Sequence, residues 1–258
     1  MHFKYKDTVL PIVRGVREIL LPEWGTAKNI GKKTERSSDV VTVLDQKVEN
    51  FLREKLAKVY PDITFVGEEG GGNRKEGRFW LVDPIDGTGH FIRGLPFCTS
   101  MLALIENSEV IFSLIYDFIN DDIYWAEKGK GAYKNDTPIH VSDRSLSDSY
   151  LCTESKVYKK YNQEFLGEIV KKTAYFASVD CGWEFAMVAC GKLDGRISFD
   201  PWGYDYDFAP GALLVSEAGG MVKNIGSIKY DYKNLDFMAV NPVVYKELEI
   251  IFKDYKRP

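Results

Sequence analysis

Apolar residues recur every three or four positions near the start of the chain, which is the spacing of one helix face. Between about residues 4 and 22 this stripe contains Val9, Ile12, Val13, Val16, Ile19 and Leu20. We expect Pro11 to kink this helix or to mark its effective start, because proline lacks an N–H group. The same spacing predicts a second helix over residues 44–60, with Thr42 and Asp45 as a capping pair at its start.

Short apolar runs bounded by turn residues follow this helix, a pattern typical of β-strands. We predict strands at residues 64–67, 79–83, 98–106, 110–116 and 123–127. Gly129 and Gly131 mark a turn after the last of them. The middle of the chain is therefore expected to form an antiparallel, meander-like sheet.

Helical spacing becomes more frequent after about residue 145. The predicted helices cover residues 163–172, 184–190, 208–218 and 242–254, with short strands at 196–199 and 236–239 between them. Because helices and strands mix throughout, we predict an α/β layered sandwich. We divide it into an N-terminal half, residues 1–145, and a C-terminal half, residues 146–258, although no flexible linker marks the boundary.

The composition is that of an ordinary soluble protein: 258 residues, 45% apolar and 28% charged. The net charge of −4 gives no indication of a nucleic-acid partner or an anionic membrane. No signal-peptide core and no stretch of about 20 apolar residues is present, so we expect a cytoplasmic protein without membrane contact. The cysteines lack metal-type spacing and are expected to be reduced, mostly buried thiols: Cys98, Cys152, Cys181 and Cys190.

Acidic residues gather in three short motifs that each adjoin a predicted strand or helix. They are Val-Gly-Glu-Glu-Gly at 66–70, Trp-Leu-Val-Asp-Pro-Ile-Asp-Gly-Thr at 80–88 and Tyr-Asp-Tyr-Asp-Phe-Ala-Pro-Gly at 204–211. In the second motif we expect the strand to end at Asp83, and Pro84 to fix a tight turn that places Asp86 on its other side. The two carboxylates can then converge on one cation, which would offset their mutual repulsion.

Hard divalent cations, Mg²⁺ above all, prefer such oxygen ligands and share their shell with substrate phosphates. The chain has only three histidines and no HExxH motif, which argues against zinc. If a helix follows Gly87 and Thr88, backbone N–H groups there would face an incoming anion. Cations on one side and amides on the other would form a phosphate cradle.

Each of these residues also has a purely structural explanation. Asp83 is also consistent with a strand-end turn residue, and Asp86-Gly87 is a common turn dipeptide. Asp207 is suited to cap a helix, and Thr42 with Asp45 to be no more than a capping pair. Taken together with the apolar strand that feeds the second motif, the residues favour a multi-carboxylate metal site suited to phosphate chemistry.

At these residues the chain resembles the inositol monophosphatase family, within the superfamily that includes fructose-1,6-bisphosphatase. Four motifs match in order over nearly the whole chain: residues 39–45, 67–69, 83–88, and 207–211 with 217–220. The resemblance implies an α-β-α-β-α sandwich, usually dimeric and often inhibited by lithium. The implied activity is hydrolysis of a small-molecule phosphate ester, with a homodimer as the expected assembly.

The resemblance also implies roles for individual residues. Two or three Mg²⁺ ions are expected, the first held by Glu68, Asp83 and the carbonyl of Ile85, and the second by Asp83, Asp86 and Asp207. Glu68 would also help to hold a weaker third ion. Thr88 and Asp45 would polarise a metal-bound water, and the amides of Gly87 and Thr88 would hold the phosphate.

The substrate-specificity region departs from the family pattern. His90, two residues after Thr88, stands where the family usually has Asn, and Phe176 stands where the family has an Arg that contacts the sugar alcohol. The family's Gly-Ser/Thr-Ala-Ala run is replaced at residues 179–184, which include Asp180 and Trp183; we expect Trp183 to pack in the core. Asp200 falls where an acidic residue contacts substrate hydroxyls.

These departures lead us to expect a polyol or sugar phosphate, or an amino-alcohol phosphate such as histidinol phosphate. In the second case Asp180 and Asp200 would favour the cationic amine. Fructose-1,6-bisphosphatase and nucleotide 3′-phosphatase activities are alternatives, although no basic pocket for a second phosphate is evident. A regulatory protein that retains the fold is a further alternative, against which the complete set of metal ligands argues.

Overall fold

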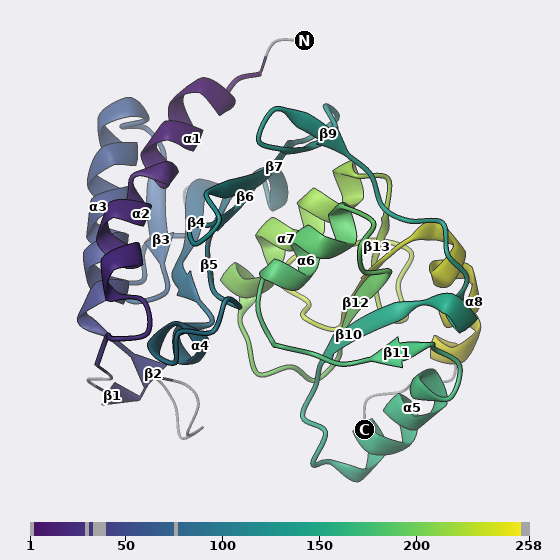
Figure 1. The fold of residues 1–258 in the computed structure, drawn as a ribbon. Helices are drawn as coiled ribbons and strands as arrows, with labels where there is room; N and C mark the ends of the chain where they lie inside the picture. Colours follow the sequence, from purple (N-terminus) through teal and green to yellow (C-terminus); the bar gives the residue numbers. More distant parts are fainter. Residues whose placement is uncertain (1–2, 29–30, 33–39, 75–76, 254–258) are drawn as a thin grey trace.

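Helical and sheet layers alternate in the order α-β-α-β-α across the molecule (Figure 1). This computed structural model describes residues 3–28, 31–32, 40–74 and 77–253. The predicted layered α/β sandwich is confirmed. The elements, with their bounds, are given layer by layer below.

The first helical layer and the first sheet come from the N-terminal part of the chain. The layer contains α1 (Lys6–Arg14), α2 (Val16–Leu20) and α3 (Val43–Val59). The seven-stranded sheet runs, in order, β3 (Thr64–Gly67), β4 (Arg78–Asp86), β5 (Thr99–Glu106), β6 (Glu109–Asp117), β7 (Asp122–Glu127), β8 (Ala132–Lys134) and β9 (Thr137–Ile139). From β4 to β9 it is the predicted antiparallel meander, whereas β3 pairs with β4 in parallel.

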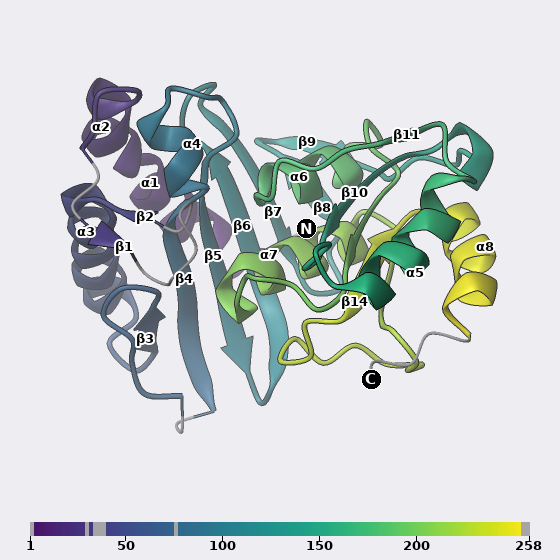
Figure 2. The ribbon, with the colours of Figure 1, turned by 90° about the horizontal axis from the view of Figure 1, so that it is seen from below.

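The remaining layers follow from residue 150 onwards. The middle layer contains α6 (Trp183–Ala189) and α7 (Asp205–Glu217), and the outer layer α5 (Lys160–Val170) and α8 (Pro242–Phe252). Between them the second sheet has the order β11 (Tyr175–Phe176), β10 (Tyr150–Glu154), β12 (Gly195–Ser198), β14 (Phe237–Val240) and β13 (Met221–Asn224). Figure 2 shows α7 enclosed between the two sheets, which explains why it is apolar on nearly every side.

The remaining elements are short. β1 (Gly31–Lys32) pairs with β2 (Val40–Val41), α4 (Thr88–Ile92) follows β4, and single turns of 3₁₀-helix cover Leu21–Glu23 and Leu146–Asp148. Asp39, the first residue of the first family motif, lies outside the described residues.

The role predicted for Pro11 is wrong. The residue lies inside α1, which begins five positions earlier, and the helix breaks instead at Gly15. The Gly15 N–H group bonds to the carbonyl of Ile12, which closes a tighter last turn. A proline in the second turn of a helix removes one hydrogen bond, and here the packing of Val9 and Val13 in the core outweighs this loss.

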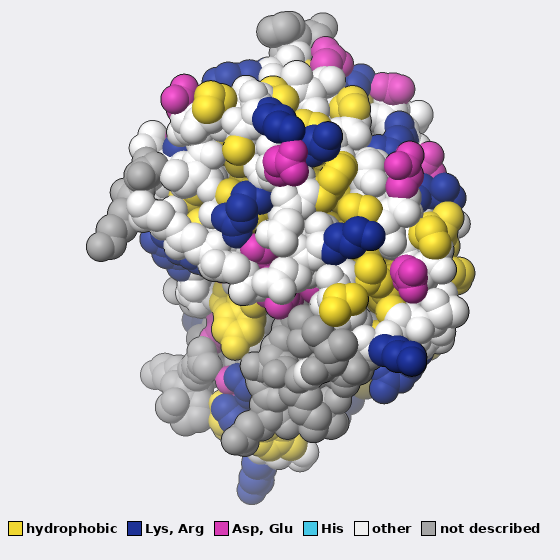
Figure 3. Space-filling model, turned by 90° about the vertical axis from the view of Figure 1, so that its left-hand side faces the viewer, with side chains coloured by type: hydrophobic (Ala, Val, Ile, Leu, Met, Phe, Trp, Pro, Cys, Tyr) yellow, Lys and Arg dark blue, Asp and Glu magenta, His cyan; other side chains and the backbone are white. Residues whose placement is uncertain are grey.

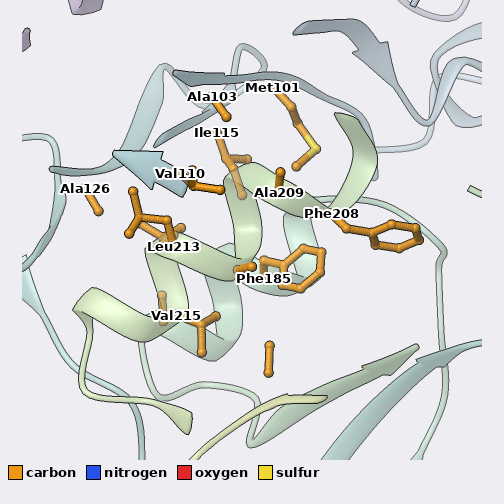
Figure 4. Close-up of a cluster of buried hydrophobic side chains, with 14 of the residues drawn as sticks. Met101, Ala103, Val110, Ile115, Ala126, Phe185, Phe208, Ala209, Leu213 and Val215 are labelled. Carbon is orange, nitrogen blue, oxygen red and sulfur yellow. The ribbon is translucent and has the colours of Figure 1, made fainter. Parts of the chain in front are cut away.

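Side chains of the central strands alternate between two cores. In β4, Trp80 and Val82 pack against α1–α3, whereas Phe79 and Leu81 face α6 and α7. Figure 4 shows the second of these cores, in which Met101 of β5 lies in one cluster with residues of α6 and α7. Trp183 packs against the same core, as predicted.

The surface on the side of α1 and α3 carries charges of both signs, interspersed with small separate hydrophobic spots (Figure 3). None of the helices in the described part of the chain is long and apolar enough to span a bilayer. All four cysteines are free, and three of them are buried.

Candidate active site

A β-bulge in β4 brings Asp83 and Asp86 together. The pairing with β5 shifts between Asp83 opposite Met101 and Asp86 opposite Thr99, so that β4 has one residue more than its partner. Residues three apart in a regular strand face opposite sides. The extra residue turns Ile85 into the α1–α3 core and returns Asp86 to the side of Asp83. The predicted strand end at Asp83 is therefore wrong, although the predicted convergence of the two carboxylates is present.

The turn lies one position beyond Asp86, at Gly87. This residue has φ +79°, and a Cβ atom there would lie 2.5 Å from the carbonyl oxygen of Phe97, so only glycine fits. α4 begins at Thr88. The N–H groups of His90 and Phe91 donate to the Gly87 carbonyl, so only the first N–H groups of the helix, those of Thr88 and Gly89, precede its hydrogen-bonded turn, as the predicted phosphate cradle requires. The phosphate contacts of Gly87 and Thr88 stay a prediction.

Asp207 completes the acidic cluster from the first turn of α7. One carboxylate oxygen from each of Asp83, Asp86 and Asp207 lies within 4.8 Å of the others. Asp207 is oriented by the backbone N–H of Tyr204, which donates to Oδ2 over 2.5 Å. Residues 83, 86 and 207 thus meet between the first sheet and the middle helices, as the motifs indicated.

The cluster is electrostatically unbalanced without a counter-charge. Burial raises the pKa of Asp86 from 3.8 to about 7, opposed by the Gly182 N–H group and the Arg196 charge. Burial, with the charges of Glu68 and Asp86, raises the pKa of Asp207 well above its usual range. Among the described residues this ligand group contains carboxylates only. An all-oxygen, acidic donor set fits a hard divalent cation such as Mg²⁺.

Asp45 and Thr88 form a buried hydrogen-bonded pair beside the cluster. The Thr88 hydroxyl lies 3.1 Å from Asp45 Oδ1 and 2.8 Å from the carbonyl oxygen of Ile85. Asp45 Oδ2 accepts from the N–H and hydroxyl groups of Thr42, at 2.7 and 2.8 Å. The predicted capping pair is therefore present, and one of its members also reaches Thr88.

Glu68 follows β3 in a turn that a buried glutamate from α3 holds in place. Glu49 accepts the N–H groups of Glu69 and Gly70, at 2.8 and 3.0 Å, and pairs with Arg53. A Cβ atom at residue 67 would come within 2.2 Å of the Glu49 carboxylate, which explains the glycine of the first acidic motif. We did not predict Glu49, because only its contacts reveal this role.

The segment that departs from the family pattern lies against Asp86 and α4. The Gly182 N–H donates to Asp86 Oδ2 over 2.5 Å, and the Thr99 hydroxyl donates to the same oxygen over 3.0 Å. The imidazole Nε2 of His90 lies 2.7 Å from the carbonyl oxygen of Val179. His90 thus connects α4 to the altered segment.

The two predicted substrate-binding aspartates have different surroundings. Asp180 is exposed and has φ +50°. Asp200 is 1% exposed, and its carboxylate accepts from Lys159, Tyr161 and Asn162, with Lys156 3.4 Å away. These donors hold its pKa below the usual range despite burial. Substrate contacts by either residue stay a prediction.

Comparisons with known proteins match nearly the whole chain to one protein family. The sequence model of the inositol monophosphatase family matches residues 6–254. The fructose-1,6-bisphosphatase/inositol-1-monophosphatase of Thermotoga maritima is 30% identical over 246 residues, covering 94% of this chain and 93% of the relative. The inositol monophosphatase of Dictyostelium discoideum is 31% identical over 264 residues, covering 95% and 93%.

Solved structures of similar proteins have the same layered fold. The inositol monophosphatase structure from Thermotoga maritima superposes with a TM-score of 0.86 at 28% identity, covering 96% of both chains. The extragenic suppressor protein suhB of Bartonella henselae gives a TM-score of 0.88 at 26% identity, covering 97% of this chain and 99% of that one.

Proposed function

The chain belongs to the inositol monophosphatase family, and from this premise we propose that it is a Mg²⁺-dependent phosphomonoesterase acting on a small polyol or sugar phosphate. Relatives named inositol monophosphatases are phosphoric monoester hydrolases, and this chain is an enzyme of that class. The observation that carries the proposal is the convergence of Asp83, Asp86 and Asp207 beside the hydrogen-bonded Asp45–Thr88 pair.

The acidic cluster would hold the metal. Asp83, Asp86 and Asp207 would hold one Mg²⁺, and Asp83 with Glu68 and the Ile85 carbonyl would hold another. When bound, Mg²⁺ supplies Lewis-acid activation of water and neutralises charge on the phosphoryl group. The raised pKa values of Asp86 and Asp207 support this assignment, because the carboxylates need a positive partner near neutral pH.

Thr88 and Asp45 would orient the attacking water. A hydroxyl has one proton and two lone pairs, so Thr88 Oγ1 can donate to Asp45 and still accept a hydrogen bond from water. Thr42 holds the Asp45 carboxylate in the required orientation. The amides at the start of α4 would bind the phosphoryl oxygens on which charge develops. The Thr88 and Asp45 side chains are both buried, which strengthens the hydrogen bond between them.

The surroundings of Asp200 favour a neutral alcohol over an amine. Two lysines already compensate its charge, so an amino-alcohol phosphate would have to rely on the exposed Asp180. The same lysines, Lys156 and Lys159, favour a bisphosphate as the second candidate. The Thermotoga maritima relative is named for both fructose 1,6-bisphosphate and inositol 1-phosphate hydrolysis.

Further features are proposed from the sequence and from the family resemblance. We propose a cytoplasmic homodimer that is sensitive to Li⁺, built from halves that meet near residue 145. The two sheets fall on either side of this boundary, but α6 and α7 of the second half cover the first sheet. Light scattering would test the dimer.

The decisive experiment is phosphate release from a substrate panel with Mg²⁺, with EDTA and with added Li⁺. The panel contains inositol 1-phosphate, fructose 1,6-bisphosphate, histidinol phosphate, 3′-phosphoadenosine 5′-phosphate and glycerol 2-phosphate. We expect Mg²⁺-dependent release, abolished by EDTA, with a polyol or sugar phosphate as the best substrate. Release that persists in EDTA would refute the metal assignment, and a preference for histidinol phosphate or the nucleotide would refute the substrate class.

A further inference from the structure

A buried guanidinium, that of Arg196, lies between two segments that flank the acidic cluster, residues 178–183 and residues 201–203. Arg196, on β12, is 1% exposed and lies between the rings of Phe185 and Phe208, 4.6 and 5.5 Å from their centres. Figure 4 shows both rings in the core between the sheets. Burying a charge is costly unless it is paired and hydrogen-bonded. The mechanism above does not use this residue, and core packing alone would be met by an apolar side chain.

Two buried glutamates pair with this guanidinium. Arg196 Nη2 donates to Glu154 Oε2 over 2.8 Å, and Nη1 lies 3.3 Å from Glu184 Oε2. Each glutamate uses its other oxygen to hold backbone. Glu184 Oε1 accepts the Val179 N–H group over 2.7 Å. Arg196 therefore lies at the centre of a network that extends to both flanking segments.

One arm of the network ends on a metal-ligand candidate. Arg196 Nη1 donates to the carbonyl oxygen of Cys181 over 2.6 Å, and the N–H of Gly182 donates to Asp86 Oδ2 over 2.5 Å. This oxygen and this N–H belong to the same peptide group, which is planar and rigid. The guanidinium and the Asp86 carboxylate thus hold opposite edges of one peptide plane, and each bond polarises the other.

The other arm ends beside Asp207. Glu154 Oε1 accepts the N–H groups of Trp202 and Gly203, at 3.0 and 2.7 Å. Gly203 packs so closely on Asp207 that a Cβ atom there would lie 2.7 Å from its Oδ2. The position of this loop is therefore coupled to the position of the Asp207 carboxylate.

We propose that Arg196 is a positioning residue, which orients Asp86 through the 181–182 peptide and fixes the 201–203 loop against Asp207 through Glu154. Arg196 acts through its contacts with the Cys181 carbonyl and the two glutamates. The expected effect on kcat rests on the proposed function. The hydrogen-bond network itself involves only groups of the protein and does not depend on that function. Residues that orient metal ligands typically change metal affinity or activity 10- to 100-fold when they are replaced.

The test compares Arg196→Lys with Arg144→Lys. Lysine keeps the charge but cannot bridge Cys181 and the two glutamates as a planar fork does. Arg144 is a matched control, because it also donates to a buried carboxylate, Asp194, and to a backbone carbonyl, away from the acidic cluster. Hydrogen exchange is measured on the metal-free proteins, Mg²⁺ affinity by calorimetry, and kcat and KM on the best substrate of the panel.

We expect Arg196→Lys to speed amide exchange in residues 178–183 and 201–204 while the strands of the first sheet stay protected. Mg²⁺ affinity and kcat should each fall about tenfold, with a smaller change in KM. Exchange, affinity and kcat all equal to those of Arg144→Lys would overturn the proposal and leave Arg196 a core residue. If the enzyme has no activity on any substrate, exchange and Mg²⁺ affinity still decide the positioning role, whereas the proposed function fails separately.

Glu154→Gln separates the two arms and covers the case in which Arg196→Lys does not fold. In this variant Arg196 still pairs with Glu184, so the buried positive charge keeps one buried negative partner. We expect faster exchange at residues 201–203 with residues 178–182 unchanged. Uniform loosening of both segments, or of neither, would contradict the two-arm arrangement.

Discussion

The Thr88 hydroxyl donates to Asp45 Oδ1 over 3.1 Å, although the two residues lie 43 positions apart in the sequence. Asp45 also accepts two hydrogen bonds from Thr42 at the start of α3. The helix cap therefore fixes the orientation of the carboxylate that Thr88 contacts. The capping of α3 and the start of α4 are consequently parts of one buried arrangement.

Removal of the Thr88 hydroxyl should lower turnover strongly without unfolding the protein. Thr88→Val keeps the shape of the side chain but cannot hydrogen-bond the attacking water, so we expect kcat to fall by roughly 10²-fold or more. Thr88→Ser should retain most of the activity. Thr173→Val, which removes an exposed hydroxyl at a helix end, is the control and should be neutral. Equal activity of the Val and Ser variants at position 88 would exclude the water-orienting role.

Asp86→Asn should nearly abolish turnover while the fold persists. The asparagine carbonyl can still accept from Gly182 and Thr99, so the local structure is retained, but the charge that a cation needs is lost. The control is Asp117→Asn, a buried aspartate that holds the Ile119 and Asn120 amides in another loop. Steady-state kinetics and circular dichroism measure the two effects. Near-normal turnover in Asp86→Asn would refute its assignment to the second metal.

The metal-free protein should lose stability as the pH rises. Folding raises the pKa of Asp86 from 3.8 to about 7, so the folded state keeps a proton that the unfolded state loses in this window. The contribution of Asp86 is therefore most favourable below pH 4 and declines through pH 7, by roughly 4 kcal/mol in total.

Urea unfolding in EDTA, at pH 4 and pH 8, measures the contribution of Asp86 to the free energy of unfolding as the difference between the wild type and Asp86→Asn. The two proteins should be similar in stability at the lower pH, and the variant should be more stable at the higher one. Saturating Mg²⁺ at pH 8 should stabilise the wild type more than the variant, because binding to the folded state shifts the equilibrium. A stability difference independent of pH would contradict the assignment.

Helix and strand predictions succeeded where local signals were strong. The stripe and the cap predicted α3 within one residue at each end, since both signals lie in the segment itself. The first turn of α7 was missed because residues 205–207 are acidic and aromatic and do not extend the apolar stripe. The short strands β8 and β9 at one end of the first sheet were missed because three residues give no periodicity.

The acidic residues of the site could be predicted from the sequence, but their supports could not. Asp83 and Asp86 were expected to converge, yet through a turn, because a bulge is defined only by its register against β5. The family resemblance drawn from the motifs is confirmed by the matches along the whole chain. Glu49 and Arg196 escaped notice because each acts through backbone groups far away in the sequence.

Replacement of Glu49, a residue in the interior of α3, should weaken Mg²⁺ binding even though Glu49 is not a proposed ligand. It is 2% exposed and holds the amides of Glu69 and Gly70, so it fixes the turn that carries Glu68, the proposed ligand of the other Mg²⁺. Glu49→Gln turns one acceptor oxygen into a donor that faces a backbone N–H group. We expect Mg²⁺ affinity to weaken about tenfold and the unfolding free energy to fall by about 1–3 kcal/mol.

Glu54→Gln on the same helix is the matched control for this change. Glu54 is exposed and pairs with Lys58 one turn away, an arrangement that contributes little to stability. Calorimetric titration with Mg²⁺ and urea unfolding of both variants distinguish a role in metal binding from a role in stability alone. If Glu49→Gln is destabilised but binds Mg²⁺ as tightly as Glu54→Gln does, the turn does not need Glu49 to present Glu68. If both affinity and stability fall only in Glu49→Gln, the α3 glutamate determines where Glu68, the proposed ligand that follows β3, lies.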